Sequence, residues 1–72
     1  MSAKCVVIYG KDGCPYTADA REQFAGRGYA VQYHNVKADA AKLSEMLKHS
    51  GGQRRVPVIV EDGKATVGFG GS

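Results

Sequence analysis

The sequence of 72 residues has no tryptophan, two cysteines and two prolines. Two cysteines are too few for a disulfide framework. They could hold zinc only with histidine ligands, and neither His34 nor His49 stands at metal-ligand spacing from them. No apolar run approaches the length of a membrane span, and the N-terminus lacks the apolar stretch of a signal peptide. From these absences we expect a soluble cytoplasmic protein with reduced thiols and without a metal or membrane partner.

The sequence also lacks a large excess of charge of one sign. The chain carries ten Lys and Arg residues against seven Asp and Glu residues, a net charge of +3. The basic residues are scattered, without a stripe or interleaved aromatic residues, so we expect no nucleic-acid partner. A mildly basic protein suits a small anionic ligand. The length and the hydrophobic fraction of 43% predict one globular domain over residues 1–72.

Hydrophobic patterns predict six elements in the order βαβαββ. Strands are predicted at 4–9, 29–36, 56–60 and 65–67, with Asp62-Gly63 as the turn before the last. The first helix begins at Pro15 and ends at Gly26 or Gly28, with Gly28 favoured as the left-handed cap. The second helix covers 39–49, with Asp39 as its cap. A parallel βαβ unit followed by an antiparallel hairpin predicts an α/β fold with a mixed four-stranded sheet.

Cys14 lies between the first strand and the first helix, directly before Pro15. The thiolate is the nucleophilic form of cysteine, and the partial positive charge and free N–H groups of a helix N-terminus favour it. Lys11 adds a cation three residues earlier. The alternative is that Cys14 is an ordinary small apolar residue. The helix start, the flanking Gly13 and Pro15, and the cation together favour a reactive thiol.

Cys5 has different surroundings, because it lies inside the first strand in an apolar run. It is therefore predicted to be a structural, buried residue. A disulfide with Cys14 would need the two Cα atoms to lie within about 7 Å of each other. The strand between the two residues is expected to hold them further apart.

Three segments resemble the glutaredoxin family. Residues 7–16, Val-Ile-Tyr-Gly-Lys-Asp-Gly-Cys-Pro-Tyr, are similar to its first strand and its active-site loop with the motif Cys-Pro-Tyr-Cys. Residues 53–57, Gln-Arg-Arg-Val-Pro, resemble its Thr-Val-Pro segment, whose proline is cis. Residues 67–71, Val-Gly-Phe-Gly-Gly, resemble its closing Gly-Gly turn. The resemblance spans nearly the whole chain and implies a thioredoxin-like fold.

One departure from the family concerns the motif itself. Thr17 stands where the family has its second motif cysteine, so no intramolecular disulfide can form within the motif. The Thr17 hydroxyl could instead donate a hydrogen bond to the Cys14 thiolate. Cys-Pro-Tyr-Thr is also similar to a bacterial glutaredoxin-like group of selenoproteins, in which selenocysteine often takes the first position. This chain would be a cysteine form of that group.

Two further departures concern the end of the sequence. Gly70 and Gly71 replace the Asp residues that follow the closing turn and, in the family, grip the γ-glutamyl end of glutathione. The sequence ends at Ser72, where the family continues into a last helix. With this C-terminal helix absent, we expect one sheet face or the first helix to be partly bare. We accordingly expect a monomer or a weak dimer.

The resemblance implies a glutathione site around Cys14. Lys11 matches the family lysine that meets the glycine carboxylate of glutathione, with a solvated loop lysine as the alternative. Tyr16 matches the tyrosine that lines the thiol pocket, with an exposed helix residue as the alternative.

The loop before the third strand and the closing turn complete this implied site. Val56 and Pro57 are expected to present backbone beside the sulfur, and Gly68 belongs to the closing turn. Arg54 and Arg55 precede that strand and could meet an anionic ligand, with a solvated pair as the alternative.

These features predict a monothiol glutaredoxin-like thiol–disulfide oxidoreductase. The Cys14 thiolate would attack a mixed disulfide between glutathione and a protein or small thiol. An external thiol, with glutathione as the implied co-substrate, would then restore the thiolate. No metal is needed for this chemistry.

Two alternatives remain open. The protein could be a thiol-type, ancestrally selenol-type, peroxidase or a reductase of another substrate, in which an external thiol resolves a sulfenic acid. It could also be a non-catalytic binding module that docks peptides or holds an iron–sulfur cluster across a dimer, as monothiol relatives with Cys-Gly-Phe-Ser do. The sequence Pro15-Tyr16-Thr17 departs from that motif and counts against the cluster.

Overall fold

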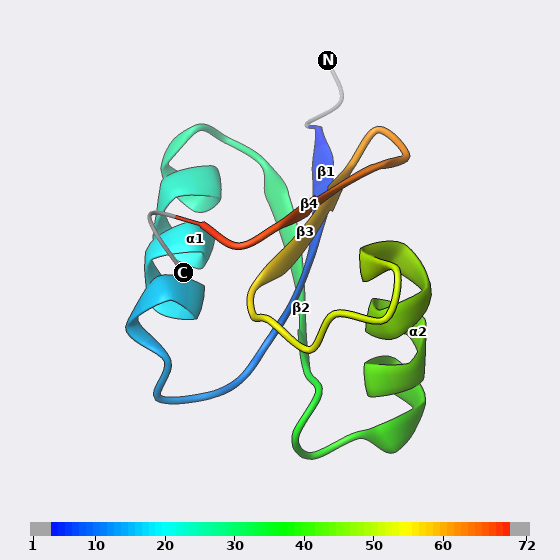
Figure 1. Cartoon of the computed structure of the whole chain (residues 1–72). Helices are drawn as coiled ribbons and strands as arrows, with labels where there is room; N and C mark the ends of the chain where they lie inside the picture. The colour runs from blue at the N-terminus through cyan, green and yellow to red at the C-terminus, as the bar shows by residue number, and fades with distance from the viewer. Residues whose placement is uncertain (1–3, 70–72) are drawn as a thin grey trace.

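The computed structural model describes residues 4–69 and shows six elements in the predicted βαβαββ order (Figure 1). The strands are β1 (Cys5–Gly10), β2 (Ala30–Asn35), β3 (Val58–Glu61) and β4 (Lys64–Val67). The helices are α1 (Pro15–Gly26) and α2 (Ala40–Ser50). The predicted α/β class and element order are therefore confirmed, and the element ends differ from the prediction by at most two residues.

The four strands form one mixed sheet in the order β2-β1-β3-β4. The pair β1–β2 is parallel, whereas β1–β3 and β3–β4 are antiparallel. Asp62 and Gly63 form the hairpin turn with φ values of 52° and 76°, as the sequence predicts. The two helices lie on opposite faces of this sheet (Figure 1).

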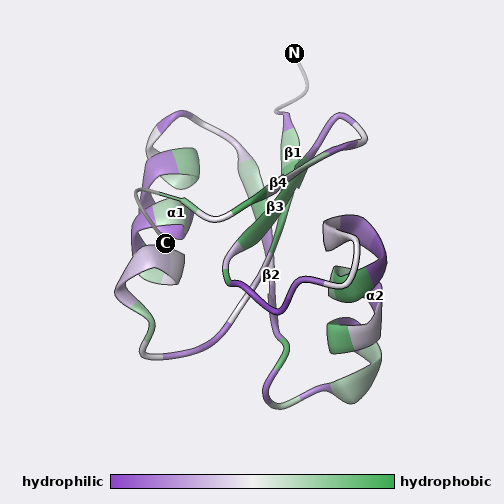
Figure 2. Cartoon of the chain, viewed as in Figure 1, coloured by the Kyte–Doolittle hydropathy of each residue, from purple (hydrophilic) through white to green (hydrophobic). Residues whose placement is uncertain are grey.

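Each face of the sheet packs its own hydrophobic cluster against one helix. On the α1 face, Ala20 and Phe24 of the helix pack with Val6, Ile8 and Ile59 of the sheet. The α2 face buries a second cluster, made of Tyr9, Val36, Met46 and Val58. Figure 2 shows the hydrophobic side of α2 turned toward the sheet and its hydrophilic side turned outward. Because helices cover both faces of the sheet, β1 has apolar residues at successive positions, from Val6 to Tyr9.

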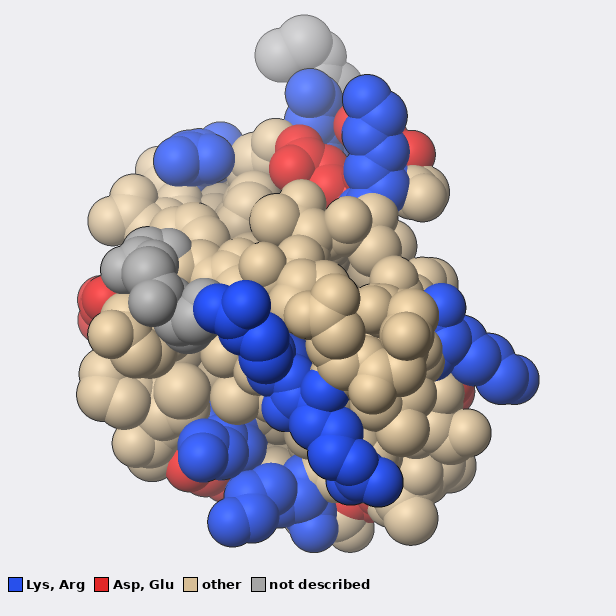
Figure 3. Space-filling view, in the orientation of Figure 1, with Lys and Arg blue, Asp and Glu red and all other residues tan. Residues whose placement is uncertain are grey.

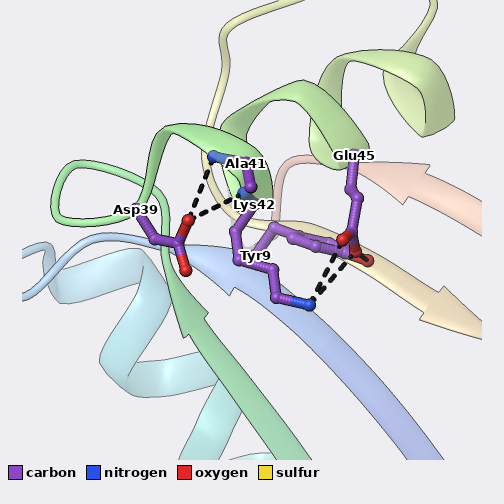
Figure 4. A network of polar contacts seen from close by, with 5 residues as sticks. All are labelled: Tyr9, Asp39, Ala41, Lys42 and Glu45. Carbon is purple, nitrogen blue, oxygen red and sulfur yellow. Dashed lines mark hydrogen bonds and ion pairs between the residues drawn. The ribbon is translucent and has the colours of Figure 1, made fainter.

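Local chemistry fixes the ends of both helices. Gly28 has φ of 83°, and the N–H groups of Gly28 and Tyr29 donate to the carbonyls of Ala25 and Phe24. This pair of hydrogen bonds forms a Schellman motif, which needs a residue in the left-handed conformation. The motif confirms Gly28, and not Gly26, as the left-handed cap of α1. At α2, an Asp39 carboxylate oxygen accepts from the N–H groups of Ala41 and Lys42 at 3.0 and 3.3 Å (Figure 4).

A polar network attaches α2 to β1 next to the loop that follows this strand. The Tyr9 hydroxyl donates to Glu45 Oε1 at 3.0 Å, and Lys42 pairs with Glu45 Oε2 at 3.2 Å (Figure 4). The hydrogen bond from Tyr9 and then that from Lys42 lower the pKa of Glu45. The network holds the first half of α2 close to the end of β1.

The prediction that Cys5 is buried was wrong. Cys5 is exposed, Val7 is half-buried and Tyr9 is 5% exposed, although all three point to the same face of β1. Burial increases along β1 because α2 covers the end of the sheet near Tyr9 and leaves the beginning of β1 open. Alternation along a strand gives the face of a residue but not how far the covering helix reaches.

The partly bare face stays a prediction: α1 and β2 leave a pocket of about 450 Å³ between them, lined by Ala18, Arg21, Glu22, Ala25, Val31 and Tyr33. Tyr16, at 40%, is the exposed large hydrophobic residue among positions 4–69. On the α1 face, the ends of β3 and β4 carry Glu61, Lys64 and Thr66, which can face water. The Tyr29 hydroxyl donates a hydrogen bond to Glu61 Oε2 at this end of the sheet.

Candidate active site

The loop after β1 places Cys14 at the N-terminus of α1. Cys14 is the N-cap residue, with an extended backbone (φ −88°, ψ 116°), and its carbonyl accepts the first helical bond from Ala18 N–H at 3.0 Å. Pro15 occupies the first helical turn, where its missing N–H removes nothing. The side chain is 8% exposed. The sulfur therefore lies at the positive end of a helix dipole, as the sequence predicts.

The surroundings of Cys14 favour its ionised form. The Thr17 hydroxyl lowers the pKa of the Cys14 thiol most, and the Thr17 backbone N–H adds to this effect. Burial acts in the opposite direction, while the Tyr16 backbone N–H and the positive charge of Lys11 lower the pKa further. Hydrogen bonds from the first turn of α1 are thus the main physical cause of the lowered pKa.

Thr17 is the buried polar residue of this site. Its side chain is 1% exposed, and its hydroxyl oxygen has no hydrogen-bond partner of good geometry among residues 4–69. A buried hydroxyl without a partner costs about 1–3 kcal/mol. A charged acceptor makes a shorter and stronger hydrogen bond than a neutral one. We therefore assign the Thr17–Cys14 hydrogen bond to the thiolate form, in which the hydroxyl gains the partner that the neutral thiol does not provide.

Gly10 allows α1 to approach β1 closely enough to place Thr17. A Cβ atom on Gly10 would lie 2.5 Å from Thr17 Cγ2 and 2.6 Å from Thr17 Oγ1. Distances this short are not tolerated, so any larger residue at position 10 would move the first turn of the helix. The last residue of β1 therefore helps to position the hydroxyl that stabilises the thiolate.

A groove of about 370 Å³ lies beside the active-site loop, on the side of α2. We call it the cationic groove; its lining residues are Lys11, Val36, Lys37, Leu43, Met46, Arg54 and Val56. Three of these residues are basic and none is acidic. Figure 3 shows Lys and Arg side chains gathered over the loop that joins α2 to β3, with few Asp or Glu side chains between them. The groove suits a ligand with carboxylates and a partly apolar body.

The structure brings some of the sequence-predicted site residues to this groove and not others. Lys11, Arg54 and Val56 line it, whereas Arg55 does not appear among its lining residues. The Val56–Pro57 peptide bond is cis, as the resemblance implies. Pro57 precedes β3 instead of beginning it, because a proline has no N–H to give to a strand ladder.

The closing turn lies next to this segment. Gly68 is buried, has φ of 87°, and its N–H donates to the Pro57 carbonyl at 2.8 Å. This hydrogen bond holds the residue after β4 against Pro57, which follows Val56. Tyr16 is exposed on α1. Gly70 and Gly71 lie outside the described residues.

Sequence reasoning missed several residues around the site. Lys37 and Leu43 line the cationic groove, but they come from the segment before α2 and from α2, far from Cys14 in the sequence. Tyr33 lies within the predicted strand 29–36, where the sequence indicates no role at the site, yet its hydroxyl donates to Asp12 Oδ1 of the active-site loop at 2.8 Å. Arg21 of α1 lies over the Tyr33 ring, 4.1 Å from its centroid. No sequence pattern signals these contacts, because the fold alone brings the residues together.

Positions 4–69 contain no group of three or more His, Cys, Asp or Glu side chains arranged to hold a metal ion. Neither helix in that range is long and apolar enough to cross a membrane.

Comparisons with known proteins agree on one family. The glutaredoxin family model matches residues 6–66. Glutaredoxin 3 of Escherichia coli is 39% identical over 57 residues, which cover 79% of this chain and 68% of that protein. The structure of the glutaredoxin grx-1 from Archaeoglobus fulgidus has a TM-score of 0.77 and 22% identity, over 89% of this chain and 74% of that chain. A buckwheat glutaredoxin–glutathione complex has a TM-score of 0.72 and 26% identity, over 88% of this chain and 59% of that chain. By sequence and by its thioredoxin-like fold, the chain belongs to the glutaredoxin family of thiol–disulfide oxidoreductases.

Proposed function

We propose that the protein is a monothiol glutaredoxin that exchanges glutathione through Cys14. The Cys14 thiolate attacks the glutathione sulfur of a mixed disulfide, and a new sulfur–sulfur bond forms between Cys14 and glutathione. The target leaves as a thiolate and takes a proton from water. A second glutathione thiolate then attacks the glutathione sulfur on Cys14, which releases oxidised glutathione and restores the Cys14 thiolate.

The observation that carries this proposal is the pairing of Cys14 with Thr17. Thr17 occupies the position from which a second cysteine could reach the sulfur, and it offers a hydroxyl that lowers the pKa of Cys14. Cys5 is not placed to take over the second role, because it begins β1 and Cys14 follows the loop at the other end of this strand. The strand advances roughly 16 Å from Cys5 to Gly10 at about 3.3 Å per residue. An external thiol is therefore required to resolve the intermediate.

We propose that the cationic groove binds glutathione through the carboxylate of its glycine. Lys11 and Arg54 supply positive charge from two loops, and Lys37 adds a third cation that the sequence comparison did not suggest. A cluster of like charges in a groove whose lining holds no acidic residue attracts a carboxylate and speeds its encounter with the site. The buckwheat relative was solved as a complex with glutathione, which supports the same ligand class here.

The remaining parts of the proposed glutathione site surround the sulfur. The backbone of Val56, before the cis Pro57, would pair with the peptide-like part of the ligand. Tyr16 and Arg55 would contact glutathione, and the turn at Gly68 would hold the Pro57 segment in place. We further propose that the protein is a cytoplasmic monomer or weak dimer. We also propose that it is a cysteine form of the selenoprotein-like glutaredoxin group.

A turnover assay with a glutathione mixed disulfide of a small thiol tests this function. We expect saturable turnover that depends on glutathione, and a KM about threefold to tenfold higher in Lys11→Ala and Lys37→Ala, since each change removes a charged contact. Lys48→Ala is the matched control, because Lys48 is an exposed lysine at the end of α2 and should leave KM unchanged. Equal rates with dithiothreitol, which has no carboxylate, would argue against a glutathione site.

A peroxidase function is the second candidate, and Thr17 in the position of a resolving cysteine favours it, because a sulfenic acid on Cys14 would then be resolved by an external thiol. The Cys14 thiolate would attack one oxygen of hydrogen peroxide, giving the sulfenic acid and a hydroxide that takes a proton to become water. One external thiol would then form a mixed disulfide with Cys14 and release water, and a second would restore the thiolate. Peroxide consumption that is the same with glutathione and with dithiothreitol would support this candidate over the first.

A further inference from the structure

The loop before Cys14 carries two charges of opposite sign, and they should act on the thiolate in opposite ways. Lys11 stabilises it, whereas Asp12 is a carboxylate only two residues before Cys14. Residues two apart in a chain have Cα atoms within roughly 7 Å of each other. That separation is below the screening length of about 8 Å at physiological ionic strength. A freely moving Asp12 carboxylate would therefore oppose ionisation of the sulfur.

The structure holds this carboxylate instead of leaving it free. Tyr33 of β2 donates its hydroxyl proton to Asp12 Oδ1 at 2.8 Å. The Arg21 guanidinium of α1 lies 4.1 Å from the centroid of the Tyr33 ring, so a cation stands next to the same pair. Three elements thus contribute to one arrangement: the active-site loop, β2 and α1.

The titration of Tyr33 agrees with this arrangement. Burial and then the Asp12 hydrogen bond raise the pKa of Tyr33 to about 12, while Arg21 lowers it and the Cys14 charge raises it. Tyr33 therefore keeps its proton near neutral pH and remains a hydrogen-bond donor. The Cys14 charge is among the causes that raise this pKa, so Tyr33 lies near the active-site sulfur.

We propose that Tyr33 is a positioning residue for the thiol, because it holds the Asp12 carboxylate against β2 and so weakens the effect of that negative charge on the Cys14 sulfur. Arg21 acts in the same direction by placing a positive charge beside the Tyr33–Asp12 pair. The charged and titratable groups near this pair are Lys11 and Asp12 from the loop, Arg21 and Glu22 from α1, and Tyr33 from β2. The inference concerns the ionisation of Cys14 and does not depend on which disulfide the protein reduces.

The test is a double-mutant cycle read through the pH dependence of Cys14 alkylation in the Cys5→Ser background. Tyr33→Phe keeps the ring under Arg21 and removes only the hydroxyl. We expect the Cys14 pKa to rise by about half a unit to one unit, since a freed carboxylate at this separation acts with about that strength. In a protein that also carries Asp12→Asn, the same Tyr33→Phe change should leave the Cys14 pKa unaltered.

Two controls separate positioning from general damage. Tyr29→Phe removes a comparable tyrosine–carboxylate bond, to Glu61, at the other end of the same sheet face, and it should not move the Cys14 pKa. Arg21→Gln, on the exposed side of α1, provides a second variant that should raise the pKa by a smaller amount and only when Asp12 is present. Salt at about 1 M should remove most of both shifts, because it screens charges beyond about 3 Å.

The proposal is overturned by either of two results. One is a Tyr33→Phe protein with the Cys14 pKa of the parent, which would show that Tyr33 does not affect ionisation. The other is a rise that persists in the Asp12→Asn background, which would assign Tyr33 a packing role independent of the carboxylate.

Discussion

The two cysteines of this chain lie at opposite ends of β1, Cys5 as its first residue and Cys14 after the loop that follows it, and their surroundings differ. Cys5 begins β1 and is exposed, whereas Cys14 follows β1 and is 8% exposed. Exposure alone would rank Cys5 as the more available thiol. Yet Cys14 has a helix N-terminus, a buried hydroxyl and a nearby lysine, and these lower its pKa. The difference teaches that local donors and charges, more than solvent access, prepare a thiol for reaction.

The largest expected effect is on turnover after each thiol is removed. Cys14→Ser should lower the rate with a glutathione mixed disulfide at least about a thousandfold, because the nucleophile is lost. Cys5→Ser should change the rate by less than about twofold, since Cys5 lies far from the site. Steady-state assays of both variants measure this contrast. Comparable losses in the two proteins would mean that Cys5 takes part in the cycle.

The next effect concerns the close approach of α1 to β1. Gly10→Ala should destabilise the protein by about 1–3 kcal/mol, because the new methyl group would overlap Thr17. Gly26→Ala is the matched control. Gly26 is the last residue of α1 and a Cβ there would meet open space, so the substitution should be neutral or stabilising by up to about 1 kcal/mol. Urea unfolding measures both free energies. A neutral Gly10→Ala would show that Thr17 can move away without loss.

A smaller effect should appear in the pH dependence of stability. The folded pKa of Cys14 is lowered, while the unfolded chain has the ordinary value of about 8.5. The stabilising contribution of the thiolate is therefore complete above about pH 8.5 and is lost as the pH falls through the folded value. Urea unfolding of the reduced protein should show stability that rises over this window relative to Cys14→Ser. Parallel curves for the two proteins would contradict a lowered pKa.

Features set by neighbouring residues could be predicted from the sequence. Gly28 and Asp39 end and begin helices through bonds to residues close in the chain, and both predictions were confirmed. The position of Cys14 before Pro15 likewise follows from local chemistry. Such features depend on a few adjacent residues and on fixed backbone geometry.

Features that depend on distant residues could not be predicted. Whether Cys5 is buried depends on how far α2 reaches across the sheet, which strand alternation does not report. Lys37 joins the cationic groove only after the chain has folded. The bond from Tyr33 to Asp12 links positions 21 residues apart in the sequence. These are tertiary contacts, and a single sequence carries no local signal for them.

The most direct test of the account is the pH dependence of Cys14 alkylation by iodoacetamide in the Cys5→Ser protein. We predict a midpoint below the ordinary value of about 8.5. Thr17→Val, which keeps the shape and removes the hydroxyl, should raise that midpoint by about one unit, the worth of one hydrogen bond to a charged group. A midpoint at or above about 8.5 in the Cys5→Ser protein, or one that Thr17→Val leaves unchanged, would contradict the account.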